Sequence, residues 1–133
     1  MLKGSCLCGQ ITYQYDGVID EISMCHCRQC QRAQGSAFAA VAPIRSSAFT
    51  ITTGQQQLAE FRASANKARV FCRLCGSPLY SARDDLPAIK RLRLGTLDTP
   101  VTAKTQYHAF VSSKASWFSI SDELPQFERF KPS

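Results

Sequence analysis

The sequence predicts a mainly β domain with little helix, stabilised by bound zinc. Two features lead to this prediction. All seven cysteines of the 133-residue chain fall in tight clusters, which is typical of zinc ligands. The segments between the clusters are short and rich in β-branched and aromatic residues, which favour strands. Because 133 residues is within the usual size of one domain, we expect residues 1–133 to form a single zinc-binding domain.

The predicted strands are separated by glycine and proline residues, which interrupt regular structure. Alternation of apolar and polar residues is clearest in the stretch 11–15, and residues 107–110 also have strand character. The expected strands are 10–15, 37–44, 48–53, 58–63 and 90–94. Only residues 28–34 favour a helix, of about two turns, and Gly35 is placed to end it.

The composition is that of an ordinary globular protein, with 44% apolar and 20% charged residues. The formal net charge is +6, but seven thiolates on two zinc ions would contribute about −3 and leave the protein at about +3. The basic residues are spread along the chain, with one short run at 90–93. On a strand Arg91 and Arg93 share one face, which we interpret as a solvated edge. We therefore expect no nucleic-acid partner.

Export and membrane insertion have no signal in this sequence. No stretch approaches the roughly 18 consecutive apolar residues of a membrane span. The N-terminal residues lack the apolar run of a signal peptide. We therefore expect a cytoplasmic protein without a membrane partner. An odd number of cysteines in such a protein argues against a disulfide framework and for metal binding.

The cysteines form three clusters that differ in spacing. They are Cys6-x-Cys8, Cys25-x-Cys27-x-x-Cys30 and Cys72-x-x-Cys75. In the last cluster two thiolates flank a tight turn, and Gly76 is free to take a positive φ just beyond it. Such a turn supplies only two ligands, so it needs a second pair to complete a tetrahedron, and Cys6 with Cys8 is the obvious one. We expect these four cysteines to form a closed, structural zinc site.

The middle cluster supplies three ligands from one short segment. Cys25 and Cys27 point the same way on an extended segment, and Cys27 and Cys30 meet if a helical turn follows. Three thiolates can then hold one zinc and leave a fourth position open, which separates catalytic from structural zinc. The alternative is a closed site with a histidine as the eighth ligand of the chain. In extended geometry His26 points away from the metal, which leaves His108, although a hydrogen-bonded imidazole is the commoner state on a strand.

In this order, the three clusters resemble the glutathione-dependent formaldehyde-activating enzyme family, which also includes centromere protein V. The residues that carry the resemblance are 4–9, 25–32, 71–77 and, near the C-terminus, 116–118 and 122–127. The resemblance implies a β-tent fold of antiparallel sheets, like that of the zinc-binding Rab chaperones. It also implies structural zinc at the first and last pairs and catalytic zinc at the middle trio, in agreement with the spacing.

The activity implied by the resemblance is the reversible addition of a thiol, glutathione or a similar one, to formaldehyde or another small aldehyde. The chain would then be a carbon–sulfur lyase. Zinc suits this reaction because it lowers the pKa of a bound thiol and polarises a carbonyl. Arg28 and Arg32 follow the trio closely and are candidates to bind a substrate carboxylate, the alternative being solvation on an exposed helix face. The alternative function is a non-catalytic module in which both zinc ions are structural and the β-tent binds a protein partner.

Overall fold

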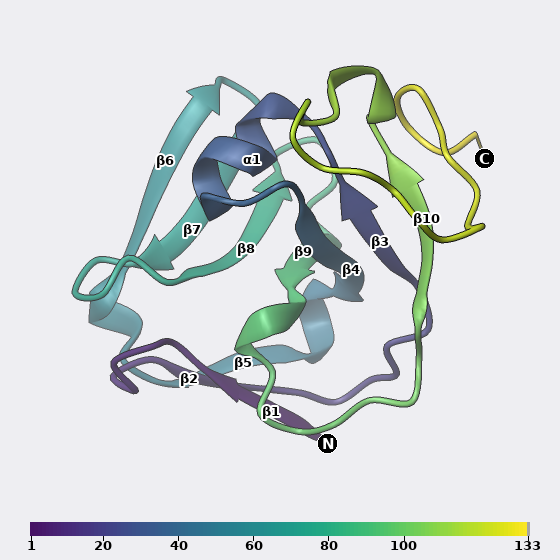
Figure 1. Cartoon of the computed structure of the whole chain (residues 1–133). Helices are drawn as coiled ribbons and strands as arrows, with labels where there is room; N and C mark the ends of the chain where they lie inside the picture. The colour runs from purple at the N-terminus through teal and green to yellow at the C-terminus, as the bar shows by residue number, and fades with distance from the viewer. Residues whose placement is uncertain (133) are drawn as a thin grey trace.

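Two β-sheets, one α-helix and several short 3₁₀ helices make up the part of the protein described by the computed structural model, residues 1–132 (Figure 1). The strands are β1 (Leu2–Ser5), β2 (Thr12–Tyr15), β3 (Ile22–Cys25), β4 (Ala39–Arg45), β5 (Phe49–Thr53), β6 (Leu58–Ser64), β7 (Lys67–Cys72), β8 (Pro78–Arg83), β9 (Ile89–Arg93) and β10 (Thr105–Ala109). The helices are α1 (Arg28–Gln34), η1 (Ser46–Ala48), η2 (Gln55–Gln57), η3 (Leu94–Thr96) and η4 (Val111–Ser113). The small sheet has the order β1–β2–β5, and the large sheet has the order β10–β3–β4–β9–β8–β7–β6.

The mainly β architecture predicted from the sequence is confirmed. Each of the predicted strands has a counterpart in β2, β4, β5, β6, β9 or β10. The predicted helix is α1, and it ends as expected, because Gly35 has a φ of 62° and donates its N–H to the carbonyl of Gln31. The strands that sequence reasoning missed are β1, β3, β7 and β8; β1 and β3 have only four residues each, and β7 has basic residues at alternate positions.

One strand pairing departs from the antiparallel sheets that the sequence led us to expect. β10 pairs with β3 in parallel, with His108 opposite Met24 and Ala109 opposite Cys25. Parallel strands cannot be joined by a tight hairpin. β10 therefore reaches the sheet edge far along the chain, through the long connection after η3 (Figure 1). The pairing places His108 beside the segment that carries the middle cysteine trio.

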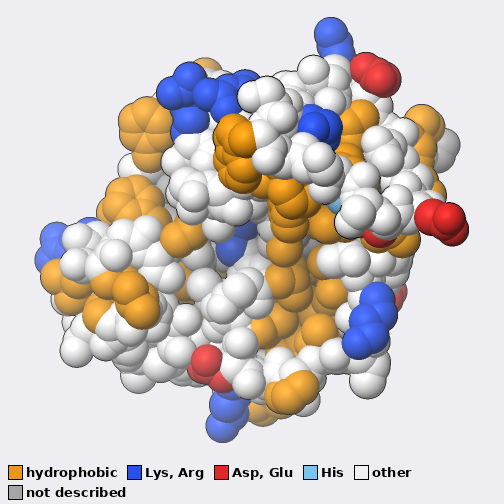
Figure 2. All heavy atoms as spheres, in the orientation of Figure 1, with side chains coloured by type: hydrophobic (Ala, Val, Ile, Leu, Met, Phe, Trp, Pro, Cys, Tyr) orange, Lys and Arg blue, Asp and Glu red, His pale blue; other side chains and the backbone are white. Residues whose placement is uncertain are grey.

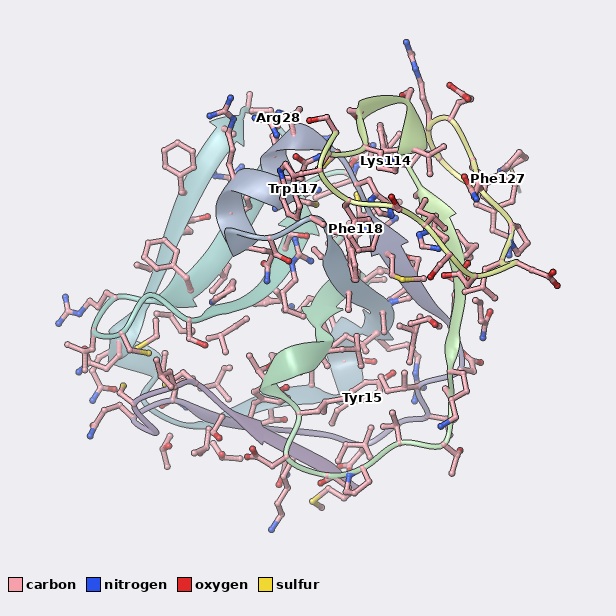
Figure 3. The ribbon with its side chains drawn as sticks, viewed as in Figure 1. Tyr15, Arg28, Lys114, Trp117, Phe118 and Phe127 are labelled. Carbon is pink, nitrogen blue, oxygen red and sulfur yellow. The ribbon has the colours of Figure 1, made fainter. Side chains whose placement is uncertain are left out.

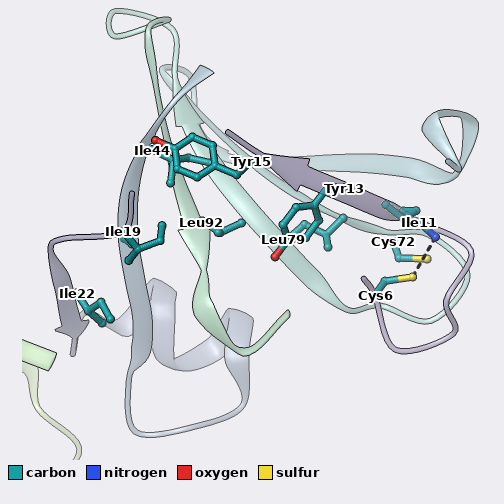
Figure 4. Close-up of a cluster of buried hydrophobic side chains, with 11 residues drawn as sticks. Cys6, Ile11, Tyr13, Tyr15, Ile19, Ile22, Ile44, Cys72, Leu79 and Leu92 are labelled. Atoms are coloured by element: carbon teal, nitrogen blue, oxygen red, sulfur yellow. Dashed lines mark hydrogen bonds between the residues drawn. The ribbon is translucent and has the colours of Figure 1, made fainter. Parts of the chain in front are cut away.

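The larger hydrophobic core lies where the small sheet faces the large one (Figure 4). In β2, Tyr13 and Tyr15 are buried and alternate with the less buried Thr12 and Gln14, as the sequence pattern predicts. Each fully buried aliphatic or aromatic side chain of this kind contributes about 1.5–3 kcal/mol to folding. The buried residues from β2 and from β4, β8 and β9 include Tyr13, Tyr15, Ile44, Leu79 and Leu92. Cys6 and Cys72 lie at one end of the same core (Figure 4).

A smaller core lies beneath the middle cysteine trio. It consists of Cys30 with Ala39 and Val41 of β4, and Cys25 and Cys27 pack against it. On the face drawn in Figure 2, Lys and Arg side chains occupy separated positions around a band of hydrophobic side chains. Among residues 1–132, no helix has both the length and the apolar character needed to span a membrane.

Candidate metal centres and the cavity beside them

The first and last cysteine pairs meet in a four-sulfur cluster, formed by Cys6, Cys8, Cys72 and Cys75, whose Sγ atoms all lie within 4.8 Å of one another. The Sγ atoms of Cys6 and Cys8 are 3.6 Å apart, and those of Cys8 and Cys72 are 3.8 Å apart. A tetrahedral zinc with Zn–S bonds of about 2.3 Å has sulfurs about 3.8 Å apart. A disulfide would need about 2.05 Å. The spacing therefore fits a closed tetrahedral metal site.

Two tight turns bring these four sulfurs together. Gly9 and Gly76 follow the two cysteine pairs with φ angles of 79° and 78°, a backbone conformation that glycine adopts without strain. Their N–H groups donate to the carbonyls of Cys6 and Cys72, at 3.1 Å and 2.7 Å. Each pair is thus held on a turn whose first cysteine is buried in the core and whose second lies nearer the surface.

Hydrogen bonding distributes the protons of this cluster unevenly: the pKa is lowered at Cys6 and Cys75, and the neighbouring thiols raise it at Cys8. The N–H of Ile11 donates to Cys6 Sγ at 3.3 Å (Figure 4). Burial opposes ionisation of Cys75, but donation from the N–H groups of Ser77 and Cys8 outweighs it. Together with the neighbouring thiols, these donors lower the pKa of Cys75 to about 6. A thiolate that forms near neutral pH is ready to bind a metal.

The middle cysteines form a second cluster, with three sulfurs within 4.8 Å of one another. Cys25 is the last residue of β3, and Cys27 is the N-cap of α1, where its Sγ accepts the N–H of Cys30 at 3.2 Å. Cys30 lies in the first turn of α1. A strand end followed by a helix start thus gathers the trio, the geometry that the spacing predicts.

Ionisation is unevenly distributed within the trio. Hydrogen bonds from the Cys25 and Cys27 thiols lower the pKa of Cys30, and the cationic Arg93 and Arg69 favour its thiolate further. The same contacts, from Cys27 first and then Cys30, raise the pKa of Cys25. Negative charge in the trio is therefore favoured most at Cys30, and the three sulfurs form a soft donor set suited to zinc.

Neither histidine completes the trio, so the closed alternative finds no support among residues 1–132. The residues grouped there are only the three cysteines. His26 is fully buried, and its Nε2 lies 2.8 Å from His108 Nδ1, so the two rings are bonded to each other. The ring of His26 packs against Phe38 and Phe118, and Phe118 points into the molecule from the segment after β10 (Figure 3).

A cavity of about 530 Å³ opens beside the trio, and it is strongly basic. All three cysteines line it, together with the cationic residues Arg28, Lys67, Arg69, Arg91, Arg93 and Lys131. Among the described residues, no Asp or Glu lines it. A second cavity of about 420 Å³ shares Lys67, Ser81, Arg91, Tyr107 and Lys131 with the first, and its lining also includes Glu21. The trio thus lies beside a cleft suited to an anionic ligand.

Comparison with known proteins agrees with this arrangement. The family model described as "Glutathione-dependent formaldehyde-activating enzyme" matches residues 1–113, most of the chain. The chain belongs to this family. Both cysteine clusters lie inside the matched region, which makes this member a protein with two potential metal centres.

The fold also matches a solved structure. A Rhodobacter sphaeroides protein of known crystal structure superposes with a TM-score of 0.62 at 22% sequence identity. The match covers 75% of this chain and 91% of that one, and it shows a shared fold. A comparison with curated proteins finds no match.

In this family member, the interpretation of Arg91 and Arg93 as a solvated edge is wrong. The two do share a face, as predicted, but β9 lies between β4 and β8, so that face borders the cavity. Arg93 is only 4% exposed, and its guanidinium donates to the carbonyl of Arg91 and to Ser81 Oγ. The residues next to Arg93 in the sequence do not reveal that β9 has a neighbouring strand on each side.

Sequence reasoning missed Lys67 and Arg69, which lie on the neighbouring strand β7. Strand register places Arg69 opposite Ser81 and Ser81 opposite Arg91, so the three form one row across β7, β8 and β9. The available signal was the shared pattern of basic residues at alternate positions, 67 and 69 in one segment and 91 and 93 in another. Burial, together with the nearby Arg69, lowers the pKa of Lys67.

The two arginines of α1 differ in position. Arg28 begins the helix, lines the cavity and donates a hydrogen bond to Gln31 Oε1 (Figure 3). Arg32 is exposed in the last turn and is not part of the cavity lining. Substrate binding by either residue stays a prediction, and the position of Arg28 favours it over Arg32.

Proposed function

We propose that this chain binds two zinc ions with different roles. Cys6, Cys8, Cys72 and Cys75 would hold a structural zinc, and Cys25, Cys27 and Cys30 would hold a catalytic one. The sulfur spacing supports the first assignment, because four thiolates complete a tetrahedron. The second is supported by a trio that has no fourth protein ligand among residues 1–132 and that lines a cavity.

The proposed reaction is the reversible addition of a thiol, glutathione or a similar one, to formaldehyde or another small aldehyde. The sulfur bonds to the carbonyl carbon, the thiol proton ends on the carbonyl oxygen, and nothing is oxidised or reduced. The reverse step is a carbon–sulfur lyase reaction, of the type of an S-hydroxymethylglutathione synthase. Zinc in the trio would lower the pKa of a thiol and polarise the aldehyde carbonyl. The family description supplies the two substrates.

The observation that carries the proposal is the charge of the cavity. Lys67, Arg69, Arg91 and Arg93 are all at least partly buried, and none lies within ion-pair distance of a carboxylate among the described residues. Buried cations without partners are unfavourable. One zinc with three thiolates carries about −1, which cannot balance four cations. The carboxylates of a substrate such as glutathione, which has two, would offset part of the positive charge that remains.

Two roles can be assigned within the basic row. Arg69 lies beside the trio, with its Nη2 3.8 Å from Cys30 Sγ and 3.2 Å from Gln29 Oε1, so it stabilises the thiolate. Lys67 and Arg91 extend the cationic lining into the region that the two cavities share, and Arg93 lies between them and Cys30, whose thiolate it also favours. These three are the proposed binding residues for the substrate carboxylates. Arg28 lies at the helix end of the same cleft.

One observation favours the second candidate function, a zinc-stabilised module that binds a protein partner. Leu7 and Leu74 lie inside the two cysteine pairs of the four-sulfur cluster and are 85% and 57% exposed. Apolar tips of this kind can contact a partner. On this alternative, both zinc ions would be structural and neither would respond to a small thiol.

The test is the rate of S-hydroxymethyl adduct formation from formaldehyde and glutathione, followed by exchange NMR in the presence of zinc-loaded protein. We expect a rate clearly above the uncatalysed reaction, which is itself measurable. Cys27→Ser should abolish the excess, because it removes a soft ligand and keeps an acceptor for the Cys30 N–H. If wild-type protein with two bound zinc ions gives only the uncatalysed rate, with glutathione and with simpler thiols, the enzymatic proposal is wrong.

A further inference from the structure

A chain of buried hydrogen bonds leads from the protein surface to the residue between Cys25 and Cys27. His26 Nε2 lies 2.8 Å from His108 Nδ1. His108 Nε2 lies 3.0 Å and 3.1 Å from the two carboxylate oxygens of Asp122. Both imidazoles are buried, whereas the Asp122 side chain is 43% exposed. The three residues come from three separate parts of the sequence.

The carboxylate sets the direction of these bonds. The hydrogen bond from His108 lowers the pKa of Asp122, which is therefore an acceptor at neutral pH. His108 then donates from Nε2, and its Nδ1 shares the second hydrogen bond with His26 Nε2. The remaining nitrogen, His26 Nδ1, is buried and has no hydrogen-bond partner among residues 1–132. His108 is thus the one polar contact that fixes the orientation of the His26 ring.

The backbone of His26 is held equally firmly. Its N–H donates to the carbonyl of Ala109 at 2.9 Å, and its carbonyl accepts from Gln31 Nε2 at 2.7 Å. The same Gln31 nitrogen donates to the carbonyl of Ser113 at 2.9 Å. The residue between two sulfur ligands is therefore bonded through its ring and its N–H to β10 and through its carbonyl to α1, and Gln31 links this contact to η4.

Asp122 reaches this network from a segment outside the family match, which ends at residue 113. That segment pairs with β10: His108 N–H donates to the carbonyl of Pro125, and Phe127 N–H donates to the carbonyl of His108, each at 2.9 Å. An aromatic side chain at 108 could fill the same space by packing alone. A buried polar chain is worth keeping where it imposes one specific geometry.

We propose that His108 and Asp122 are positioning residues of the three-cysteine centre. They hold the His26 ring on the far side of the segment, and this orients Cys25 and Cys27 so that both sulfurs face Cys30. The inference rests on the proposed function only in taking the trio as a metal centre. It extends the set of residues that build the centre to the C-terminal segment.

The experiment measures the release of each metal equivalent to a chelator from protein carrying two zinc ions. Loss of an outer hydrogen-bond partner commonly weakens metal binding about 10–100-fold. We expect His108→Phe to accelerate release of one equivalent by about that factor, because it keeps the ring volume but removes both bonds. Asp122→Ala should have a smaller effect, since water can reach His108, and Asp122→Asn smaller still, since its amide oxygen can accept. Release of the other equivalent should not change.

Glu123→Ala is the matched control, because it removes the same charge from the same segment at an exposed side chain. It should leave both release rates unchanged. Cobalt-substituted protein provides a second readout: the spectrum assigned to the trio should change in His108→Phe, and that of the four-sulfur cluster should not.

The proposal is overturned if His108→Phe leaves both release rates unchanged. It is also overturned if His108→Phe raises both rates equally, because the hydrogen bonds of His108 would then stabilise the whole fold and not the trio. If His108→Phe does not fold, the rates of zinc release from the trio in the other three variants decide. We expect the fastest release in Asp122→Ala, slower release in Asp122→Asn and the wild-type rate in Glu123→Ala; equal rates in all three overturn the proposal. A protein that shows these shifts but no catalysis would refute the proposed reaction and leave the positioning role intact. Wild-type protein that binds only one zinc would refute both.

Discussion

The two cysteine clusters use the same ligand atom in different surroundings. The four-sulfur cluster is built on two glycine turns, and its two inner cysteines are buried in the main core. The trio is built on a strand end and a helix start, and all of its members line a cavity. The number of ligands and the access around them, rather than ligand type, separate a structural centre from a reactive one.

The charges around the two clusters also separate a closed centre from an open one. A zinc with four thiolates carries about −2 and is enclosed by turns. The trio would carry about −1 with zinc, and it faces Arg69, Arg93 and Lys67, with no acid in the cavity lining of residues 1–132. An excess of positive charge beside an open centre recruits an anion, whereas a closed centre needs no further ligand.

The largest expected effect comes from breaking the closed centre. Cys72 is fully buried, and Cys72→Ser should prevent stable folding. A structural zinc contributes about 10–16 kcal/mol of apparent binding free energy, which equals or exceeds the roughly 5–15 kcal/mol stability of a typical domain. Circular dichroism and gel filtration would check this. A folded Cys72→Ser protein that retains two zinc ions would contradict the assignment.

The matched change in the open centre is Cys27→Ser. It should remove catalysis and one zinc while lowering the free energy of unfolding by less than Cys72→Ser does, because the trio packs against only the smaller core. Chemical denaturation and metal analysis on the same sample would measure both quantities. The comparison between the clusters fails if Cys27→Ser unfolds the protein as completely as Cys72→Ser.

A change in the cavity tests the charge argument. Arg93→Met should lower kcat/KM for glutathione about 10–150-fold, the factor that corresponds to losing one charge-assisted hydrogen bond of about 1.5–3 kcal/mol. The rate with an uncharged thiol such as 2-mercaptoethanol should fall less, because only the effect of Arg93 on the Cys30 thiolate is then lost. Arg32→Met serves as the comparison on the exposed face of α1. An equal loss in Arg32→Met and none in Arg93→Met would place substrate binding on the helix instead of in the cavity.

The smallest expected effect concerns the turns. Gly76 has a φ of 78°, and an added Cβ would meet no atom within 4 Å, so the cost of Gly76→Ala is backbone strain alone. That strain is about 1–2 kcal/mol. Zinc should leave the four-sulfur cluster somewhat faster, while its release from the trio should not change. Chelator kinetics would show this, and a faster release from the trio instead would contradict the separation of the two centres.

Much of this arrangement follows from local pattern. The partition of the cysteines and the end of α1 at Gly35 were predictable because spacing and period-two geometry act over a few residues. The basic cavity was not predictable, because it depends on the register that aligns Arg69, Ser81 and Arg91 across three strands. A sequence shows alternation on each strand but not which strands become neighbours.

The two histidines also show that local sequence pattern does not reveal which distant segments meet. Local geometry predicts that His26 turns away from the sulfurs, and the structure places its ring there. Its partner His108 is 82 residues away in the sequence, and Asp122 is a further 14 residues on. The parallel pairing of β10 with β3 brings them together, and that pairing departs from the antiparallel sheets that we expected.

The central claim, one closed and one open centre in the same chain, is tested most directly by titrating cobalt-substituted protein with glutathione. The account predicts that the absorption of one cobalt ion changes in a saturable way while the absorption of the other stays constant. Cys27→Ser should lose the responsive cobalt and keep the silent one. A spectrum in which neither cobalt responds, or in which both respond together, would contradict the account.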